Sequence, residues 1–151
     1  MSTNRKFATQ RQSIVDALVG KLKTINGTGA FLSNVANNVS PRLKFWDEVD
    51  DFPSIHVNAG SETREYQTGG VKDRFLSITL RCYVNEEDAV DALSALLEDV
   101  EVVIEANSRL AYTDRTGTAR TTLQNTIVSI DTDEGVLEPL GVGEMLIEVR
   151  Y

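Results

Sequence analysis

The clearest periodic signal in the chain is an alternation of apolar and polar residues from Val71 to Val84. Residues on one side of an extended chain in this run are apolar: Leu76, Ile78, Leu80, Cys82 and Val84. Residues on the other side are mainly polar: Ser77, Thr79, Arg81 and Tyr83. Because side chains alternate between the two faces of a strand, this pattern predicts a strand with one face in the core and one in water.

Further strands are predicted on both sides of this run. The stretch "SIHVNAG" follows Pro53 and places Ile55 and Val57 opposite His56, while "ETREYQ" is a candidate second strand. Gly69-Gly70 is expected to form the turn before the long strand. Two more strands are predicted near the end of the sequence, over about Leu123–Thr132 and Glu144–Tyr151.

Two segments have helical spacing. Apolar residues from about Lys6 to Ile25 share one face of a helix, which Asn26-Gly27 is expected to end. The second helix, of roughly 20 residues, is capped by Asn85 with Asp88 in its first turn, and its apolar residues step by three and four: Val90, Leu93, Leu97, Val100 and Ile104.

This order of elements predicts an α+β fold, with a mixed, mainly antiparallel β-sheet and two amphipathic helices packed on one face. Two polar stretches, Ser61–Lys72 and Arg109–Thr122, are expected to form extended loops or hairpin arms, named here the first arm and the second arm. The chain has 151 residues, without an internal repeat or linker, so residues 1–151 are expected to form a single domain.

The composition is that of a water-soluble globular protein, with 41% hydrophobic and 25% charged residues. Apolar runs are far shorter than the roughly 20 residues that a membrane-spanning helix needs, so no membrane partner is expected. The first residues carry no apolar signal core. The single cysteine cannot form an internal disulfide, and these features together favour folding in a reducing cytoplasm.

The formal net charge of −8 argues against general affinity for nucleic acid, which requires clustered Lys and Arg. Charge is also segregated, because the segment from Asn85 to Ser108 carries eight acids and no Lys or Arg. Residues expected to form the acidic face of the second helix are Glu87, Asp91, Glu98, Glu101 and Glu105. Such a face is solvated, meets a basic partner, or lines a passage where DNA must not adhere.

Two motifs near the end of the chain resemble ligand sites but have simpler explanations. Asp131, Asp133 and Glu134 lack the alternating ligands and distal Glu of a calcium loop, and Asp and Gly suit a turn between strands. Gly141-Val142-Gly143 precedes a strand, not a helix, so it lacks the helix N-terminus that binds phosphate. A bulge or turn is therefore expected there.

The remaining candidates also favour structure over catalysis. His56, the only histidine, is expected on the wet face of its strand, and Cys82 is expected to be a buried hydrophobe. Acids at Asp47, Asp50 and Asp51 are expected in a solvated loop, without the basic neighbours of a metal-dependent nuclease. The sequence therefore predicts no enzyme, metal or cofactor, with a small acidic metal-dependent nuclease as the alternative of a different class.

Four stretches, which together cover most of the chain, resemble one known family: "NVSPRLKF", "WDEVDDFPSIHVNAGSETREY", "RFLSITLRCYVNEEDAVDALSALLEDVEVVIEA" and "SIDTDEGVLEPLGVGEMLIEVRY". In this order they are similar to the tail terminator proteins of long-tailed, non-contractile bacteriophages, the siphoviruses. Each motif is loose, and the resemblance depends on their order along the chain.

The resemblance implies a structural virion protein without catalytic residues, assembled in the host cytoplasm. It implies a hexameric ring at the head-proximal end of the tail that stops polymerisation of the tube and docks the head. The implied partners are other copies of the chain, the tail tube protein and a head-completion or neck protein, while DNA passes through the ring without specific binding. A connector or neck protein, or a tail-tube subunit, is the alternative of the same class.

Within that role, the two arms are expected to contact the tube or adjacent subunits. The candidate contact residues are Arg64, Tyr66, Arg74, Arg115 and Arg120. The acidic face of the second helix is expected to line the lumen or to meet a basic partner.

Overall fold

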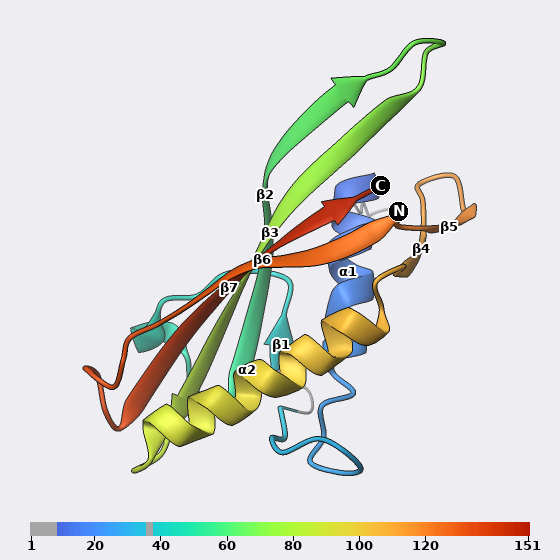
Figure 1. Cartoon of the computed structure of the whole chain (residues 1–151). Coiled ribbons are helices and arrows are strands. Elements are labelled where there is room, and N and C mark those ends of the chain that lie inside the picture. Colours follow the sequence, from blue (N-terminus) through green and yellow to red (C-terminus); the bar gives the residue numbers. More distant parts are fainter. Residues whose placement is uncertain (1–8, 36–37) are drawn as a thin grey trace, which may run out of the picture.

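The computed structural model describes residues 9–35 and 38–151, and Figure 1 shows the arrangement of their helices and strands. The elements are α1 (Gln10–Leu22), β1 (Val39–Ser40), a 3₁₀ turn (Trp46–Glu48), β2 (Ser54–Tyr66), β3 (Lys72–Asn85), α2 (Ala89–Ala106), β4 (Ala111–Thr113), β5 (Ala119–Thr121), β6 (Gln124–Thr132) and β7 (Leu140–Arg150). In this part of the chain, neither helix is long and apolar enough to cross a membrane.

The main sheet has the strand order β1-β2-β3-β7-β6, and β4 and β5 form a separate two-stranded ribbon. Only the short β1 pairs in parallel, with Ile55 and His56 of β2, and the other neighbours are antiparallel. The α+β fold class predicted from the sequence is confirmed, including the mixed, mainly antiparallel sheet.

The core lies between one face of this sheet and both helices. Its sheet residues occupy matching positions on neighbouring strands: Ile55 opposite Cys82, Val57 opposite Leu80, Leu80 opposite Met145, and Ile78 opposite Ile147. These side chains are fully buried and belong to the same cluster as the apolar faces of α1 and α2. The alternation read from the sequence therefore identified the correct face of β3.

Element boundaries differ from the sequence predictions in four places. The stretches "SIHVNAG" and "ETREYQ" form one continuous strand, β2, with a bulge between Ala59 and Glu62. Helix α1 is shorter than expected, although residues 6–8 of the expected helix lie outside the described part. Asn85 does not cap α2. Asn85 is the last residue of β3 and pairs with Leu140. The next backbone N–H, that of Glu86, donates to the Pro139 carbonyl, and α2 begins only after Asp88.

The fourth difference concerns Gly141 and Gly143, which lie inside β7 and not in a turn or bulge before it. They pair with Val84 and Cys82 of β3, directly beneath α2. A Cβ added at Gly143 would lie 3.1 Å from Leu93 Cδ1 and 3.3 Å from both methyl groups of Leu97. The glycines thus allow the helix to pack close to the sheet.

Candidate functional site: interaction surfaces

The first arm continues β2 and β3 beyond the rest of the sheet, as Figure 1 shows at the top of the view. Strand β7 ends where Arg150 pairs with Phe75, and the ribbon continues to the turn at Gly69-Gly70. Near its tip, Tyr66 is 72% exposed and Val71 is 59% exposed. The arm therefore presents apolar side chains to solvent at one end of the molecule.

The base of the first arm is fixed by polar contacts to the end of the chain and to α1. Glu62 accepts hydrogen bonds from the Tyr151 hydroxyl and, at 2.8 Å, from Arg64 Nε. Arg74 lies over the Tyr151 ring, 5.3 Å from its centroid, and donates to Gln10 Oε1 at 2.7 Å. Burial and the hydrogen bond to Glu62 raise the pKa of Tyr151 to about 12, so its hydroxyl is protonated and donating at neutral pH.

The second arm is the β4–β5 ribbon with its turn. Arg120 forms an ion pair with Asp114, which also accepts from the backbone N–H groups of Thr116 and Thr118. These bonds hold the pKa of Asp114 well below its usual range, with the hydrogen bond from Arg120 as the largest cause. Arg120 is thus partly committed to shaping its own turn, whereas Arg115 is exposed at the tip.

The base of the second arm is anchored to the body. Tyr112 of β4 is buried, and its hydroxyl accepts a hydrogen bond from Gln10 Nε2 of α1 at 2.7 Å. Because Gln10 also contacts Arg74, one residue of α1 connects the bases of both arms. The two arms that share this support carry Arg64, Tyr66, Arg115 and Arg120, and Arg74 lies at the base of the first arm.

The acidic face of α2 is present, with two corrections, the first being that Glu87 precedes the helix and does not belong to it. Glu87, Asp91, Glu98 and Glu105 are exposed, and Glu101 is half-buried. Asp99, in the same acidic run, is instead almost completely buried. Its carboxylate accepts hydrogen bonds from the backbone N–H groups of Leu32, at 3.0 and 3.1 Å, and Ser33, at 2.7 Å. Asp99 therefore fixes the loop after α1 and does not belong to the solvated face.

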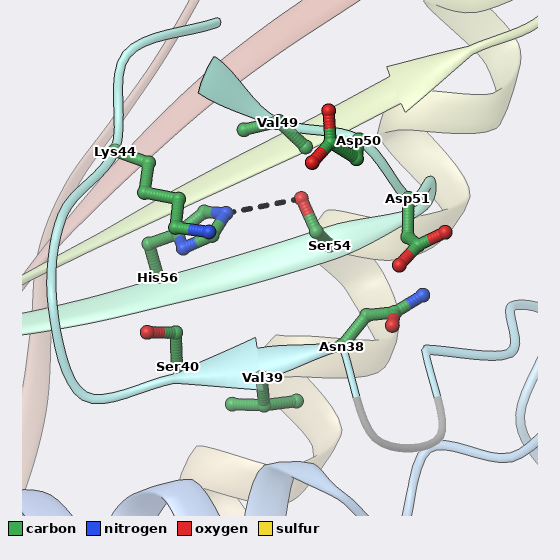
Figure 2. A pocket seen from close by; sticks show the side chains of 9 residues that line it. All are labelled: Asn38, Val39, Ser40, Lys44, Val49, Asp50, Asp51, Ser54 and His56. Carbon is green, nitrogen blue, oxygen red and sulfur yellow. Dashed lines mark hydrogen bonds between the residues drawn. The ribbon is translucent and has the colours of Figure 1, made fainter.

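A small hollow of about 200 Å³ lies between β1, β2 and the loop that joins these two strands, and Figure 2 shows its lining side chains. The hollow is lined by Asn38, Val39, Ser40, Lys44, Val49, Asp50, Asp51, Ser54 and His56. His56 Nε2 lies 3.1 Å from Ser54 Oγ, and the ring packs edge-on against Tyr83 at 5.6 Å. Asp51 points away from the imidazole (Figure 2).

The expectation that His56 faces water is wrong, because only 4% of it is exposed. The loop after β1 crosses this end of the sheet and covers His56. The Tyr83 hydroxyl fixes this loop by donating a hydrogen bond to the Lys44 carbonyl at 2.5 Å. Burial lowers the pKa of His56, and the positive charges of Lys44 and Arg81 lower it further, while a hydrogen bond to the Arg42 backbone opposes them. His56 is therefore a neutral structural residue at pH 7.

The stability of the protein is expected to decrease below about pH 6.5 partly through His56. Because the unfolded chain binds this proton more tightly than the folded chain, the contribution of His56 is complete above its unfolded pKa and is lost as the pH falls from that value through the lower pKa of the folded state. Urea unfolding of the wild type and of His56→Gln, from about pH 8 to about pH 5, measures this as a difference in pH dependence. Parallel curves for the two proteins would contradict it.

The acidic turn and the cysteine behave as the sequence predicted. Asp133 accepts from the backbone N–H groups of Leu137 and Val142, which closes the turn between β6 and β7. Cys82 is fully buried, and burial raises the pKa of its thiol to about 12, so it remains protonated. Both are explained by the fold alone.

Sequence reasoning did not identify a set of exposed apolar side chains near β6. Val128 and Ile130 of β6 are 55% and 42% exposed, and Val136 and Leu137 project from the following turn. The bulge between Ile127 and Ser129 interrupts the alternation that would have revealed which side chains face outward.

Comparison with known proteins gives these surfaces a context. A family model described as "Bacteriophage Tail Tube Terminator Protein" matches residues 8–151. The tail tube terminator protein p142 of Escherichia phage T5 is 32% identical over 149 residues, covering 93% of this chain and 92% of that protein. A chain of a native gene transfer agent virion shares the fold, with a TM-score of 0.58, 11% identity, and coverage of 91% of this chain and 96% of that one.

These comparisons show a structural protein of the phage virion tail. The chain belongs to the bacteriophage tail tube terminator family.

Proposed function

We propose that this chain forms a homohexameric ring on the head-proximal end of a siphovirus tail tube. In that position it stops tube polymerisation and offers the surface on which the head-completion or neck protein docks. The family match over residues 8–151 carries the proposal, and it also favours one domain over the whole chain without catalytic activity. The two exposed arms support it, because a protein that caps a tube must reach beyond its own body to grip neighbouring subunits.

The arms supply the proposed contacts to the tube or to adjacent subunits. Tyr66 and Arg115 are the outermost candidates, because both are exposed and lie near an arm tip. Arg64, Arg74 and Arg120 contribute charge from within local ion pairs or hydrogen bonds, so they exchange existing partners when they bind. In the two ion pairs the arginine side chain is about half exposed, at 46% for Arg64 and 54% for Arg120, so it can be approached by a new partner.

The acidic residues of α2 have two proposed roles. They line or border the lumen and repel passing DNA, or they meet a basic partner surface. The open face of the sheet is also polar, with Ser77, Thr79 and Glu148 on it. A lumen formed by either surface would let DNA pass without specific binding.

The proposal is tested with the purified protein alone and mixed with the cognate tail-tube protein. Light scattering measures the mass of the assembly, and negative-stain microscopy measures the lengths and ends of the tubes. A six-fold ring, or a monomer that shortens tubes and decorates one end, supports termination. A protein that ignores tubes, or that cleaves DNA when a divalent metal is added, would overturn it.

Charge reversal in the second arm provides the matching prediction. Arg115→Glu is expected to weaken tube capping and lengthen tubes without loss of stability, because surface substitutions of this kind change stability by less than about 0.5 kcal/mol. Arg120→Glu is expected to weaken capping more, because it also breaks the pair with Asp114.

Lys21→Glu, on the exposed side of α1, is the matched control for Arg115→Glu. Normal tube lengths with both Arg115→Glu and Arg120→Glu would remove the second arm from the interface.

A further inference from the structure

Both outer edges of the main sheet expose backbone groups that the described residues leave unpaired. Strand β6 is the last strand in the order, and the opposite edge, on β2, is covered by β1 only at Ile55 and His56. An open strand edge is a row of hydrogen-bond donors and acceptors that can pair with another chain.

Backbone hydrogen bonds show which N–H groups are free. Asp133 N donates to Val142 O at 3.0 Å across the β6–β7 pair. Successive backbone N–H groups along an antiparallel strand point alternately toward one neighbouring strand and away from it. The N–H groups of Ile130 and Thr132 therefore point away from β7. Gln67 N donates to Val71 O at 2.6 Å in the first arm, so by the same alternation the N–H groups of Arg64 and Tyr66 point away from β3.

The β6 edge lacks the features that normally block pairing. Strand β6 contains no Lys, Arg or Pro, Asp131 is its only charged residue, and Val128 and Ile130 are exposed. Natural edges that avoid association usually carry Lys or Pro, or are very short, whereas this strand has nine residues. Its bulge disturbs the region around Val128 but leaves 129–132 regular.

The directions of the strands fit a contact between copies. Strands β2, β3, β7 and β6 alternate in direction, so β6 is antiparallel to β2. If copies repeat around an axis to which the strands are inclined, β6 of one protomer meets β2 of the next in antiparallel orientation, displaced along the strand direction. This is a heterologous contact, and it is the type that closes into a ring.

Side chains at the two edges are also complementary. Glu62 lies opposite the buried Leu76, so Arg64 and Tyr66, two and four residues further on, share the helix-bearing face of the sheet. Ile130 lies opposite the buried Met145 and is on the same face. Side by side, the exposed ring of Tyr66 from one copy would cover Ile130 of the next.

The charge on Arg64 has a counterpart beside β6. Val90 and Ser94 of α2 line a hollow together with Thr132 and the turn that follows β6. Steps of three and four residues from Ser94 lead along the same side of the helix to Glu98, Glu101 and Glu105. Antiparallel pairing of Tyr66 with Ile130 places Arg64 opposite Thr132, and therefore beside Ser94. The nearest acids of α2 are Asp91 and Glu98, one turn before and one turn after Ser94.

We propose that the first arm of each protomer, through residues 64–66 of β2, adds an antiparallel strand to residues 130–132 of β6 of the neighbouring copy, with Tyr66 over Ile130 and Arg64 toward Asp91 and Glu98. This inference rests on the ring of the proposed function and names the contact that builds it. Because β1 already occupies the edge of β2 at Ile55 and His56, the neighbouring sheet pairs only further along the arm, so adjacent sheets are staggered.

The test is a disulfide cross-link in the full-length Tyr66→Cys, Ile130→Cys double variant, oxidised in the assembled state with the tail-tube protein. Within one chain the two positions are about 26 Å apart along the strand direction, because Tyr66 pairs with Lys72 and Ile130 lies at the level of Leu80. A disulfide needs Cα atoms closer than about 7 Å, so only different copies can be linked. The native Cys82 is buried and does not react.

A covalent ladder that rises above the dimer on a non-reducing gel is expected for the double variant, whereas each single variant is expected to remain monomeric because its cysteine has no reactive partner in the contact. Arg64→Glu in this background is expected to reduce the ladder several-fold, and Asp91→Arg with Glu98→Arg to restore it.

Three other results would overturn the proposal in different ways. Wild-type rings and capped tubes without a ladder would reject this contact and leave the proposed function intact. Efficient dimers from Tyr66→Cys alone would indicate a symmetric contact between arms. A wild type that forms no ring and caps no tube would remove the proposed function as well.

Discussion

Replacing Gly141 by alanine is expected to lower the free energy of unfolding by about 2 kcal/mol. An added Cβ would lie 2.7 Å from Val84 Cγ2 and 3.3 Å from the backbone oxygen of Ala89, where α2 begins. Val84 is itself buried, so neither neighbour can move aside without disturbing the core. Urea unfolding followed by circular dichroism measures the change.

Gly20→Ala is the matched control, because it makes the same chemical change on the exposed side of α1. A Cβ at Gly20 meets nothing within 4 Å, and alanine is the better helix former by about 1 kcal/mol. The two substitutions are therefore expected to shift stability in opposite directions. A Gly141→Ala protein as stable as the wild type would show that α2 can move away from β7 without loss of packing.

Replacing Asp99 by alanine is expected to cost about 3 kcal/mol of stability, because it leaves the N–H groups of Leu32 and Ser33 without their charged acceptor. The neighbouring Glu98 is exposed on the outer side of the same helix. Glu98→Ala removes the same charge one residue away and is expected to change stability by less than about 0.5 kcal/mol.

Thermal and urea unfolding of the two alanine variants, side by side, separate a structural carboxylate from a surface one. Equal stabilities would mean that water replaces the Asp99 carboxylate at the two amides. Asp99→Asn is expected to fall between them, because its amide has one acceptor oxygen where the carboxylate has two.

Elements with a strong period could be predicted from the sequence, and positions set by distant contacts could not. The alternation in β3 and the three-and-four spacing in α2 record directly which side chains are buried, so fold class and core face followed from them. His56 was placed on the wrong side of the burial boundary because the loop that covers it comes from residues 40–51, outside the period of β2. Asp99 was hidden for a similar reason, since its partners lie 66 and 67 residues away.

The interaction surfaces divide in the same way. Polar composition located both arms, and paired glycines marked the turn of the first, because a ribbon outside the core needs neither apolar periodicity nor burial. The unpaired edge of β6 was not visible, because strand order is a property of the sheet and not of any one strand. The sequence therefore located the two arms, but the strand order of the sheet was needed to show that the β6 edge is available to pair with an arm.

The outer part of the first arm has β2 and β3 as its only strands among the described residues, because β7 stops at Arg150. A two-stranded ribbon is marginally stable by itself, and holding each residue in one conformation costs about 1 kcal/mol. If the arm pairs with a strand of the next copy, every incomplete ring leaves one arm and one β6 edge unpaired. Partial rings are then disfavoured relative to the closed one, so closure approaches an all-or-none event in which the last subunit makes two contacts at once.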